Sequence, residues 1–278
     1  MKILISADIE GVAGVYHHEQ VRPGNPEYER ARRLMAAEAS AAVAGAFDGG
    51  ATEVYVNDSH GGFRNMPPDL LDERAQVIQG KPRYLGMVAG VELGIDGVCL
   101  LGYHSRAQGR GILAHTINSF AFARVCVNGQ ELGEAGLYGA LAGAYDAPVI
   151  MGSGDDVFID ENRSLFPHAV FVQTKRATGQ LSGISLSPTR SCAAIRDGVQ
   201  QAVKAQAGTM AGSRPTPLRL DAPMRITVQT QTPAQADLFC QWPTLTRTDG
   251  DALAFDAADI ETAIRMLNSL SAMSSMLR

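Results

Sequence analysis

The stretch KILISADIEG, residues 2–11, largely determines how the rest of the chain can fold. Its first part, KILISA, is mostly apolar and is typical of a buried β-strand. The strand ends in two carboxylates, Asp8 and Glu10, directly before Gly11. Residues two apart on an extended chain point to the same side, so these two negative charges would repel each other. We therefore expect a cation to lie between them.

The rest of the chain predicts an α/β protein. Strand-like and helix-like stretches alternate, which is the pattern of a mostly parallel sheet with helices on both faces. Besides the first strand, strands are expected in TEVYVND (52–58), AQVIQG (75–80), GVCLLGY (97–103), APVIMGSGDD (147–156) and AVFVQTK (169–175). The segments AHTINSF (114–120) and ARVCVNGQEL (123–132) are expected to form an extended pair, with a hairpin turn at Asn128 and Gly129.

The clearest helix signal follows the first strand. Asn25 and Pro26 are a typical N-cap and first-turn residue, and the helix should end near Phe47, before two glycines. Further helices are expected over residues 133–144 and 188–207. The side of the first helix that faces the sheet is expected to carry mostly small residues: Leu34, Ala37, Ala41 and Ala44.

A change of composition divides the chain. Residues 208–223 are rich in proline and glycine, which is typical of a linker. Beyond them, a strand, a short helix, a turn near Asp249 and a final helix predict a small α+β unit. We therefore expect an α/β catalytic domain over residues 1–208 and a small α+β portion over residues 209–278.

The composition also excludes some classes of protein. The chain has 278 residues and a net charge of −5, which argues against binding to nucleic acid, because that function needs a basic face. No apolar run is long enough for a transmembrane helix, so no membrane association is expected. The chain starts almost directly with a strand rather than with a signal-peptide pattern, so we expect a cytoplasmic location.

Candidate metal ligands follow several of the predicted strands. His60 and His104 each come just after a strand, and Glu134 opens a helix. Because the carboxyl ends of parallel strands lie at one edge of a sheet, these groups should meet Asp8 and Glu10 there. Imidazoles and carboxylates together suit zinc, with cobalt and manganese as alternatives. Five ligands are too many for one open catalytic zinc but fit two metal ions, with Asp8 as the bridge.

Several of these segments resemble a known family. They are ADIEGVAGV (7–15), VNDSHGG (56–62), LGYHSRA (101–107), AHTINS (114–119), NGQELGEAGL (128–137), VIMGSGDD (149–156), VQTKRATG (172–179) and SLSP (185–188). In order and spacing they are similar to the motifs of the DppA-type zinc-dependent D-aminopeptidases, over most of residues 1–190. The resemblance implies two zinc ions per subunit, with Asp8, Glu10, His60, His104 and Glu134 as ligands.

The resemblance also implies an activity and an assembly. It implies removal of the N-terminal residue from short peptides, such as D-Ala-D-Ala, with His115 as the catalytic histidine. From chemistry alone, His115 could transfer a proton to the leaving amine or stabilise the oxyanion, and the sequence leaves both open. Family members form a homo-oligomer, a decamer of two pentameric rings. This chain departs from the family at Gln180, where a basic residue is expected, which concerns substrate preference rather than the metal chemistry.

Other polar residues near the same edge have alternative interpretations. Asp58 could orient His60 or only cap its own loop. Asp155 and Asp156 could contact the substrate amine, but a helix cap is favoured. Lys175 could meet a substrate carboxylate or be solvated.

Two other functions are consistent with the same groups. A metal-dependent phosphoesterase would use a similar two-metal site, but no basic cluster for phosphate is evident near the predicted edge. A non-catalytic peptide-binding protein would have closed, structural metal sites.

Overall fold

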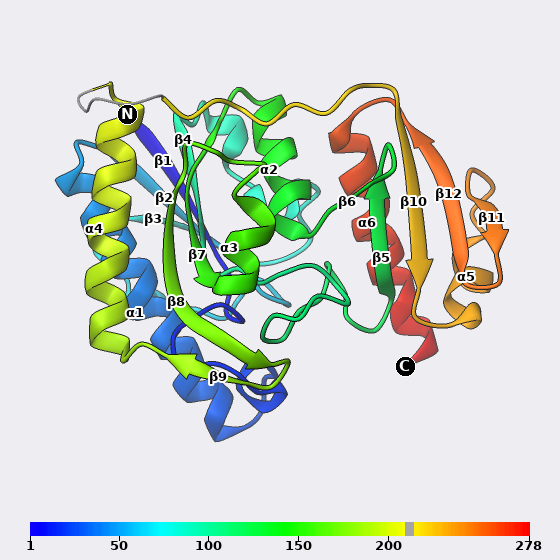
Figure 1. The fold of residues 1–278 in the computed structure, drawn as a ribbon, viewed down its shortest axis with the longest axis horizontal. Coiled ribbons are helices and arrows are strands. Elements are labelled where there is room, and N and C mark those ends of the chain that lie inside the picture. The colour runs from blue at the N-terminus through cyan, green and yellow to red at the C-terminus, as the bar shows by residue number, and fades with distance from the viewer. Residues whose placement is uncertain (209–213) are drawn as a thin grey trace.

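The computed structural model describes residues 1–208 and 214–278, and its central feature is a largely parallel β-sheet (Figure 1). The strands of this first sheet are β1 (Lys2–Ala7), β2 (Glu53–Asp58), β3 (Gln76–Ile78), β4 (Gly97–Leu101), β7 (Val149–Asp155), β8 (Val170–Gly179) and β9 (Ser182–Ser185). Their order is β3-β2-β1-β4-β7-β8-β9, and all neighbours are parallel except β8 and β9. The predicted strands of the α/β unit are therefore confirmed.

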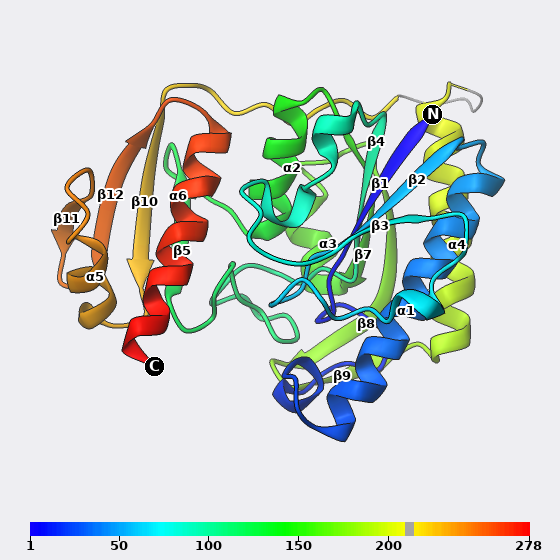
Figure 2. The ribbon, with the colours of Figure 1, turned by 180° about the vertical axis from the view of Figure 1, so that it is seen from behind.

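Helices cover both faces of this sheet, as predicted. Helices α1 (Pro26–Asp48) and α4 (Pro188–Gln206) lie on one face, and α2 (Glu134–Ala144) and α3 (Asp156–Asn162) lie on the other (Figures 1 and 2). The side chains of β1 alternate between two hydrophobic clusters: Ile3 and Ile5 pack with α1 and α4, whereas Leu4 packs with α2.

Helix α1 begins as predicted, but its buried side differs. The Asn25 side chain accepts a hydrogen bond from the Tyr28 backbone N–H at 3.0 Å, and Pro26 is in the first turn. In the predicted stripe, Ala37 is exposed and the other three residues are half-buried; Met35, Ala39 and Ala42 are buried instead. The reason is that α1 packs against α4 as well as against the sheet.

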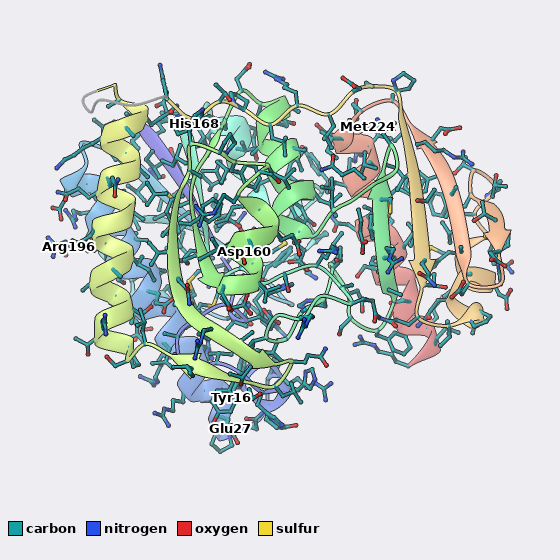
Figure 3. The ribbon with its side chains drawn as sticks, in the orientation of Figure 1. Tyr16, Glu27, Asp160, His168, Arg196 and Met224 are labelled. Carbon is teal, nitrogen blue, oxygen red and sulfur yellow. The ribbon has the colours of Figure 1, made fainter. Side chains whose placement is uncertain are left out.

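The contact between α1 and α4 is very close. A Cβ atom at Gly45 would lie 2.3 Å from the backbone oxygen of Arg196 on α4, a residue labelled in Figure 3. Only a glycine permits this approach of the two helices. Because α1 packs against both the sheet and α4, its buried side is rotated around the helix axis relative to the side predicted for packing on the sheet alone.

A second, antiparallel sheet combines two distant parts of the chain. In the order β11-β12-β10-β5-β6, its strands are β11 (Thr246–Asp249), β12 (Ala252–Ala257), β10 (Met224–Thr230), β5 (Phe122–Val127) and β6 (Gln130–Glu131). The two helices of this part are α5 (Pro233–Phe239) and α6 (Ile260–Met273). Helix α6 packs between α2 and the second sheet (Figure 2). The C-terminal residues thus share a sheet with residues 122–131.

The region around β5 is partly as predicted. The hairpin turn is confirmed, since Asn128 and Gly129 have φ angles of 51° and 82°. The prediction that residues 114–120 are extended and pair with this hairpin is wrong, because they form a loop with no strand. Leu113, directly before this segment, and Ile117, within it, have φ angles of 56° and 61°, which interrupt an extended backbone.

Short 3₁₀ helices complete the described elements. They are η1 (His18–Val21), η2 (Pro68–Leu70), η3 (Gly86–Val88), η4 (Val91–Leu93) and η5 (Ser274–Leu277). The predicted domain boundary between residues 208 and 209, and part of the predicted linker, fall on residues 209–213, outside the described part of the chain. The division into domains stays a prediction. Among the described residues, none of the helices combines the length and the apolar character that crossing a membrane requires.

Candidate metal centre

Asp8 and Glu10 follow β1 and lie buried at the carboxyl edge of the sheet. The backbone N–H of Asp8 donates to the Leu101 oxygen at 2.8 Å, which continues the pairing of β1 with β4. A Cβ atom at Gly11 would lie 2.0 Å from the Tyr103 oxygen, so the chain can pass this close only with glycine there. The side chains of Asp8 and Glu10 are almost inaccessible to solvent, with 3% and 4% exposed.

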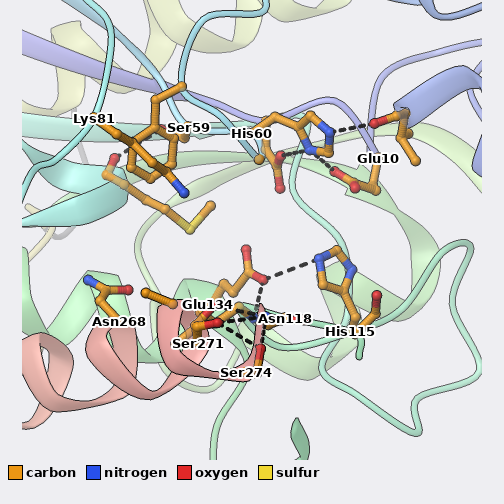
Figure 4. A pocket seen from close by; sticks show the side chains of 18 of the residues that line it. Glu10, Ser59, His60, Lys81, His115, Asn118, Glu134, Asn268, Ser271 and Ser274 are labelled. Carbon is orange, nitrogen blue, oxygen red and sulfur yellow. Dashed lines mark hydrogen bonds and ion pairs between the residues drawn. The ribbon is translucent and has the colours of Figure 1, made fainter. Parts of the chain in front are cut away.

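The other four predicted ligands meet around Asp8. Nδ1 of His60 lies 3.3 Å from Oδ1 of Asp8 and 3.1 Å from Oε2 of Glu10. Nε2 of His104 lies 3.4 Å from Oδ2 of Asp8 and 3.5 Å from Oε2 of Glu134. The two oxygens of Asp8 therefore face two different imidazoles, each with a second carboxylate beside it. Figure 4 shows Glu10 with His60 on one side of the pocket and Glu134 on the other.

The remaining nitrogen of each imidazole is held by the backbone. Nε2 of His60 lies 2.8 Å from the Val21 oxygen, and Nδ1 of His104 lies 3.0 Å from the Ser105 oxygen. Since a carbonyl oxygen only accepts, these nitrogens carry the protons, and the lone pairs of the opposite nitrogens point into the cluster. This arrangement fits imidazoles that are poised to bind metal ions.

The cluster contains buried polar atoms that lack a partner. Within the described residues, Nε2 of His104 and Oε2 of Glu10 are buried and make no hydrogen bond. Lone pairs on nitrogen and carboxylate oxygen that face each other at 3.1–3.5 Å repel unless positive charge lies between them. The donor set therefore fits metal ions, as the sequence predicted for the first strand.

The pKa values show the same need for positive charge. Burial lowers the pKa of His60, but the carboxylates of Glu10 and Asp8 outweigh burial and raise it well above its usual value. Likewise, burial opposes a charge on His104, yet Glu134 and Asp8 raise its pKa well above the usual value. Burial, together with the charge of Glu10, raises the pKa of Asp8. Three buried carboxylates thus require compensating cations, either protons on the imidazoles or metal ions.

His115 lies beside this cluster but is oriented differently. Its ring stacks on His104 with ring centroids 4.1 Å apart and an angle of 12° between the planes. Its Nδ1 lies 2.9 Å from the Leu113 oxygen, so Nε2 is the free nitrogen, 3.6 Å from Oε1 of Glu134. The same Oε1 accepts a hydrogen bond from the Ile117 N–H at 2.5 Å. His115 is thus held at the rim of the cluster, with one nitrogen available.

Asp58 caps its own loop rather than orienting His60. Its carboxylate accepts hydrogen bonds from the backbone N–H groups of Asn65 and Met66 and from the Asn65 side chain. The orienting partner of His60 is the Val21 carbonyl, which the sequence did not indicate because a backbone oxygen leaves no residue-type signal.

Asp155 and Lys175 are structural. Asp155 caps α3 by accepting from the Phe158 N–H at 2.8 Å, as the favoured interpretation predicted. Lys175 is buried, and its ammonium group donates to the backbone oxygens of Glu10 and Val15. Neither of its predicted states, solvated or facing substrate, is observed; Lys175 instead fixes the segment that carries Glu10.

The cluster faces a pocket of about 990 Å³. Helix α6 and the turn after it form one wall, including Asn268, Ser271 and Ser274 (Figure 4). Gln180 also lines the pocket. Cationic side chains from separate segments line it as well: Arg22, Lys81, Arg83, Arg265 and Arg278. The sequence contained no sign of these five cations together, because the folded chain brings them from separate segments into the lining of one pocket.

The chain was also compared with known proteins. Residues 1–269 match the model of the D-aminopeptidase family, peptidase M55. A D-aminopeptidase of Bacillus subtilis (strain 168) is 36% identical over 191 residues, which are 69% of each chain. A solved structure, the Zn-dependent D-aminopeptidase DppA from Bacillus subtilis, described as a self-compartmentalizing protease, has a TM-score of 0.93 and 28% identity over 99% of this chain and 98% of that chain.

These matches confirm the resemblance that the sequence motifs indicated. The family match covers nearly the whole chain, and the curated relative has the sequence identity expected within a family. The chain is therefore a peptide-hydrolysing enzyme of the D-aminopeptidase family M55.

Proposed function

We propose that this enzyme is a zinc-dependent aminopeptidase that removes the N-terminal residue from short peptides, including D-amino-acid-containing peptides such as D-Ala-D-Ala. The observation that carries the proposal is the position of Asp8, whose two oxygens face His60 and His104. The family match supports aminopeptidase activity, and the similar protein of known structure is described as Zn-dependent. Phosphate-ester hydrolysis or peptide binding without catalysis would leave the family match unexplained.

The donor set supports two zinc ions per subunit. Glu10 and His60 would hold one ion, His104 and Glu134 would hold the other, and Asp8 would bridge them. Mixed nitrogen and oxygen ligands are those that zinc prefers, although cobalt and manganese accept similar sets. When bound, such ions lower the pKa of a water molecule towards neutrality and polarise a carbonyl group.

His115 would act on the proton or on the developing negative charge. Since its Nδ1 donates to the Leu113 oxygen, the free Nε2 is the atom that exchanges a proton. At the rim of the cluster, that atom either transfers a proton to the leaving amine or, when protonated, donates a hydrogen bond to the oxyanion. Its contact with His104 fixes the ring plane in both cases.

A closed assembly is part of the proposal. The similar solved protein is described as self-compartmentalizing, and it covers nearly the whole of this chain. We therefore propose a homo-oligomer, a decamer of two pentameric rings, that encloses the active sites. Light scattering that gives a monomeric mass at micromolar concentration would refute this assembly.

The activity is tested by metal analysis and a substrate panel on the same sample. The panel contains D- and L-aminoacyl amides, a D-alanyl dipeptide and a chromogenic phosphate ester. We expect about two zinc ions per chain, hydrolysis of the amides and dipeptide but not of the ester, loss of activity with a chelator and recovery with zinc. Full activity after complete removal of metal, or hydrolysis of the ester alone, would contradict the proposal.

A further inference from the structure

Two cationic side chains line the pocket outside the metal cluster and share one aromatic ring. Nζ of Lys81 lies 4.5 Å from the centroid of the Phe63 ring, and Cζ of Arg83 lies 4.0 Å from it. Both residues follow β3 and line the same pocket as Asp8, Glu10 and Glu134. The aromatic ring therefore holds two positive charges close together on the pocket wall.

Neither side chain forms an ion pair within 4.0 Å in residues 1–208 and 214–278. The Arg83 guanidinium donates to neutral oxygens, Oδ1 of Asn57 at 2.8 Å and the Asp58 backbone oxygen at 2.7 Å. For Lys81, no carboxylate oxygen lies within 4.0 Å of the ammonium group in residues 1–208 and 214–278. The backbone and Asn57 fix Arg83, whereas the exposed Lys81 is free to bind a ligand.

Another cation of the same pocket behaves differently. Arg265 on α6 lies 3.6 Å from the carboxylate of Glu261 and stacks over the Tyr84 ring at 5.1 Å. Arg265 therefore already has a carboxylate partner.

Arg22 and Arg278 line the pocket too and, like Lys81, have no carboxylate within 4.0 Å in residues 1–208 and 214–278. Lys81 differs from both because it shares an aromatic ring with a second cation that lacks an ion pair, Arg83.

The metal cluster and Lys81 lie on different sides of the pocket. Figure 4 shows Lys81 entering the pocket from the side opposite Glu10 and His115, with Ser59 and His60 between. With zinc bound, the three carboxylates of the metal cluster would be neutralised, whereas the other side of the pocket keeps the positive charge of the Lys81 ammonium group. A short peptide with its amino end at the metal cluster has a carboxylate at its other end, which is the group that an ammonium group binds. Two extended residues reach about 7 Å, so such a ligand can present both ends within one pocket.

We propose that Lys81, supported by Arg83, binds the C-terminal carboxylate of the peptide substrate and thereby selects free short peptides over longer or blocked ones. The inference rests on the proposed function, because the amino end of the substrate must lie at the metal cluster. An ion pair inside a partly enclosed pocket is screened less than one on an open surface, so a single lysine can discriminate. Arg83 raises the positive potential without needing to touch the carboxylate.

The test combines two substrates with three variants. The substrates are D-Ala-D-Ala and its C-terminal amide, which differ only in the C-terminal group, a charged carboxylate in one and a neutral carboxamide in the other. The variants are Lys81→Met, which removes the charge at similar length, Lys81→Arg, which restores it, and Arg265→Met as the matched pocket control. For each, kcat and KM are measured on protein with equal zinc content and equal circular dichroism.

We expect Lys81→Met to raise the KM for the free dipeptide about 10- to 100-fold, the usual effect of losing a hydrogen bond to a charged group. The KM for the amide should stay within about twofold, Lys81→Arg should recover most of the loss, and Arg265→Met should leave the ratio of the two substrates unchanged. Equal losses on both substrates, or no loss, would overturn the role of Lys81 while hydrolysis of the amide upheld the proposed function. Wild-type protein that hydrolyses neither substrate would overturn both.

Discussion

Replacing Glu38 with glutamine should stabilise the protein increasingly as the pH rises. Glu38 is on α1 and only 2% exposed. Its Oε1 accepts hydrogen bonds from the Ala13 N–H at 3.0 Å and the Ser191 hydroxyl at 2.7 Å. Its Oε2 is buried and has no hydrogen-bond partner in the described residues. A negative charge at this position is therefore poorly compensated, and glutamine imitates the protonated acid.

The expected size of the effect follows from the pKa. Burial raises the pKa of Glu38 from 4.5 to about 7, and its two hydrogen bonds only partly oppose this. The folded protein therefore favours the protonated form of Glu38. The contribution of this residue to stability is fully present below pH 4.5 and is lost as the pH rises through about 7. A shift from 4.5 to about 7 is about 2.5 units, or about 3 kcal/mol of unfolding free energy at most.

The assay is denaturant unfolding of wild type and Glu38→Gln from pH 4.5 to 8, at saturating zinc. We expect the difference in unfolding free energy to grow in favour of the variant by about 2–3 kcal/mol across this range. Burial lowers the pKa of neighbouring Lys175 to about 8, so it stays charged below pH 7 and adds no slope there.

A matched control shows whether the pH dependence is specific to the buried Glu38 or common to any glutamate on the helix. Glu27 is exposed at the start of the same helix (Figure 3). The unfolding free energy of Glu27→Gln relative to wild type should change by less than about 1 kcal/mol over the same pH range. A difference between wild type and Glu38→Gln that is constant with pH, or that shrinks as the pH rises, would refute the reasoning.

Three further predictions concern the active site, and zinc content is measured on each variant. Asp8→Ala should lose both zinc ions, because its oxygens face both imidazoles; full zinc occupancy would disprove the bridging role. His115→Ala should keep both ions while kcat falls about 10²- to 10⁴-fold, and loss of zinc in proportion to activity would make His115 a ligand instead. Asn118→Ala should lower kcat about tenfold with unchanged zinc, since the Asn118 amide donates to Ser271 and Ser274 and thereby anchors the loop that carries His115; unchanged kcat would show that this anchor is dispensable.

The meeting of the candidate ligands could be predicted because three of the strands are neighbours. β2, β1 and β4 are adjacent and parallel, so the residues that follow them lie along one edge. Asp8 and Glu10 follow β1, His60 follows β2, and His104 follows β4. The residues that follow these three strands could therefore be placed together at the shared edge.

Contacts made by the backbone or by distant segments could not be predicted in this way. The Val21 carbonyl orients His60, but any residue type could supply that oxygen. Lys175 gives the signal of a strand end, although its ammonium group turns inward to backbone oxygens. Lys81 lies over the ring of Phe63, and only the fold brings these two loops together on the pocket wall. Such positions are determined by tertiary packing rather than by local pattern.

The route of the chain between His104 and Glu134 explains why the C-terminal residues belong to the active site. After His104 the chain leaves the first sheet, passes through the loop of His115, and forms β5 and β6 before it returns with Glu134 at the start of α2. β5 pairs with β10, so the second sheet holds the segment that follows the His115 loop. Within the loop, the Asn118 side chain donates a hydrogen bond to Ser271 in the last turn of α6. The loop that carries His115 is thus fixed from both sides by residues beyond 213. Mutations in α6 should therefore affect catalysis without touching a candidate zinc ligand.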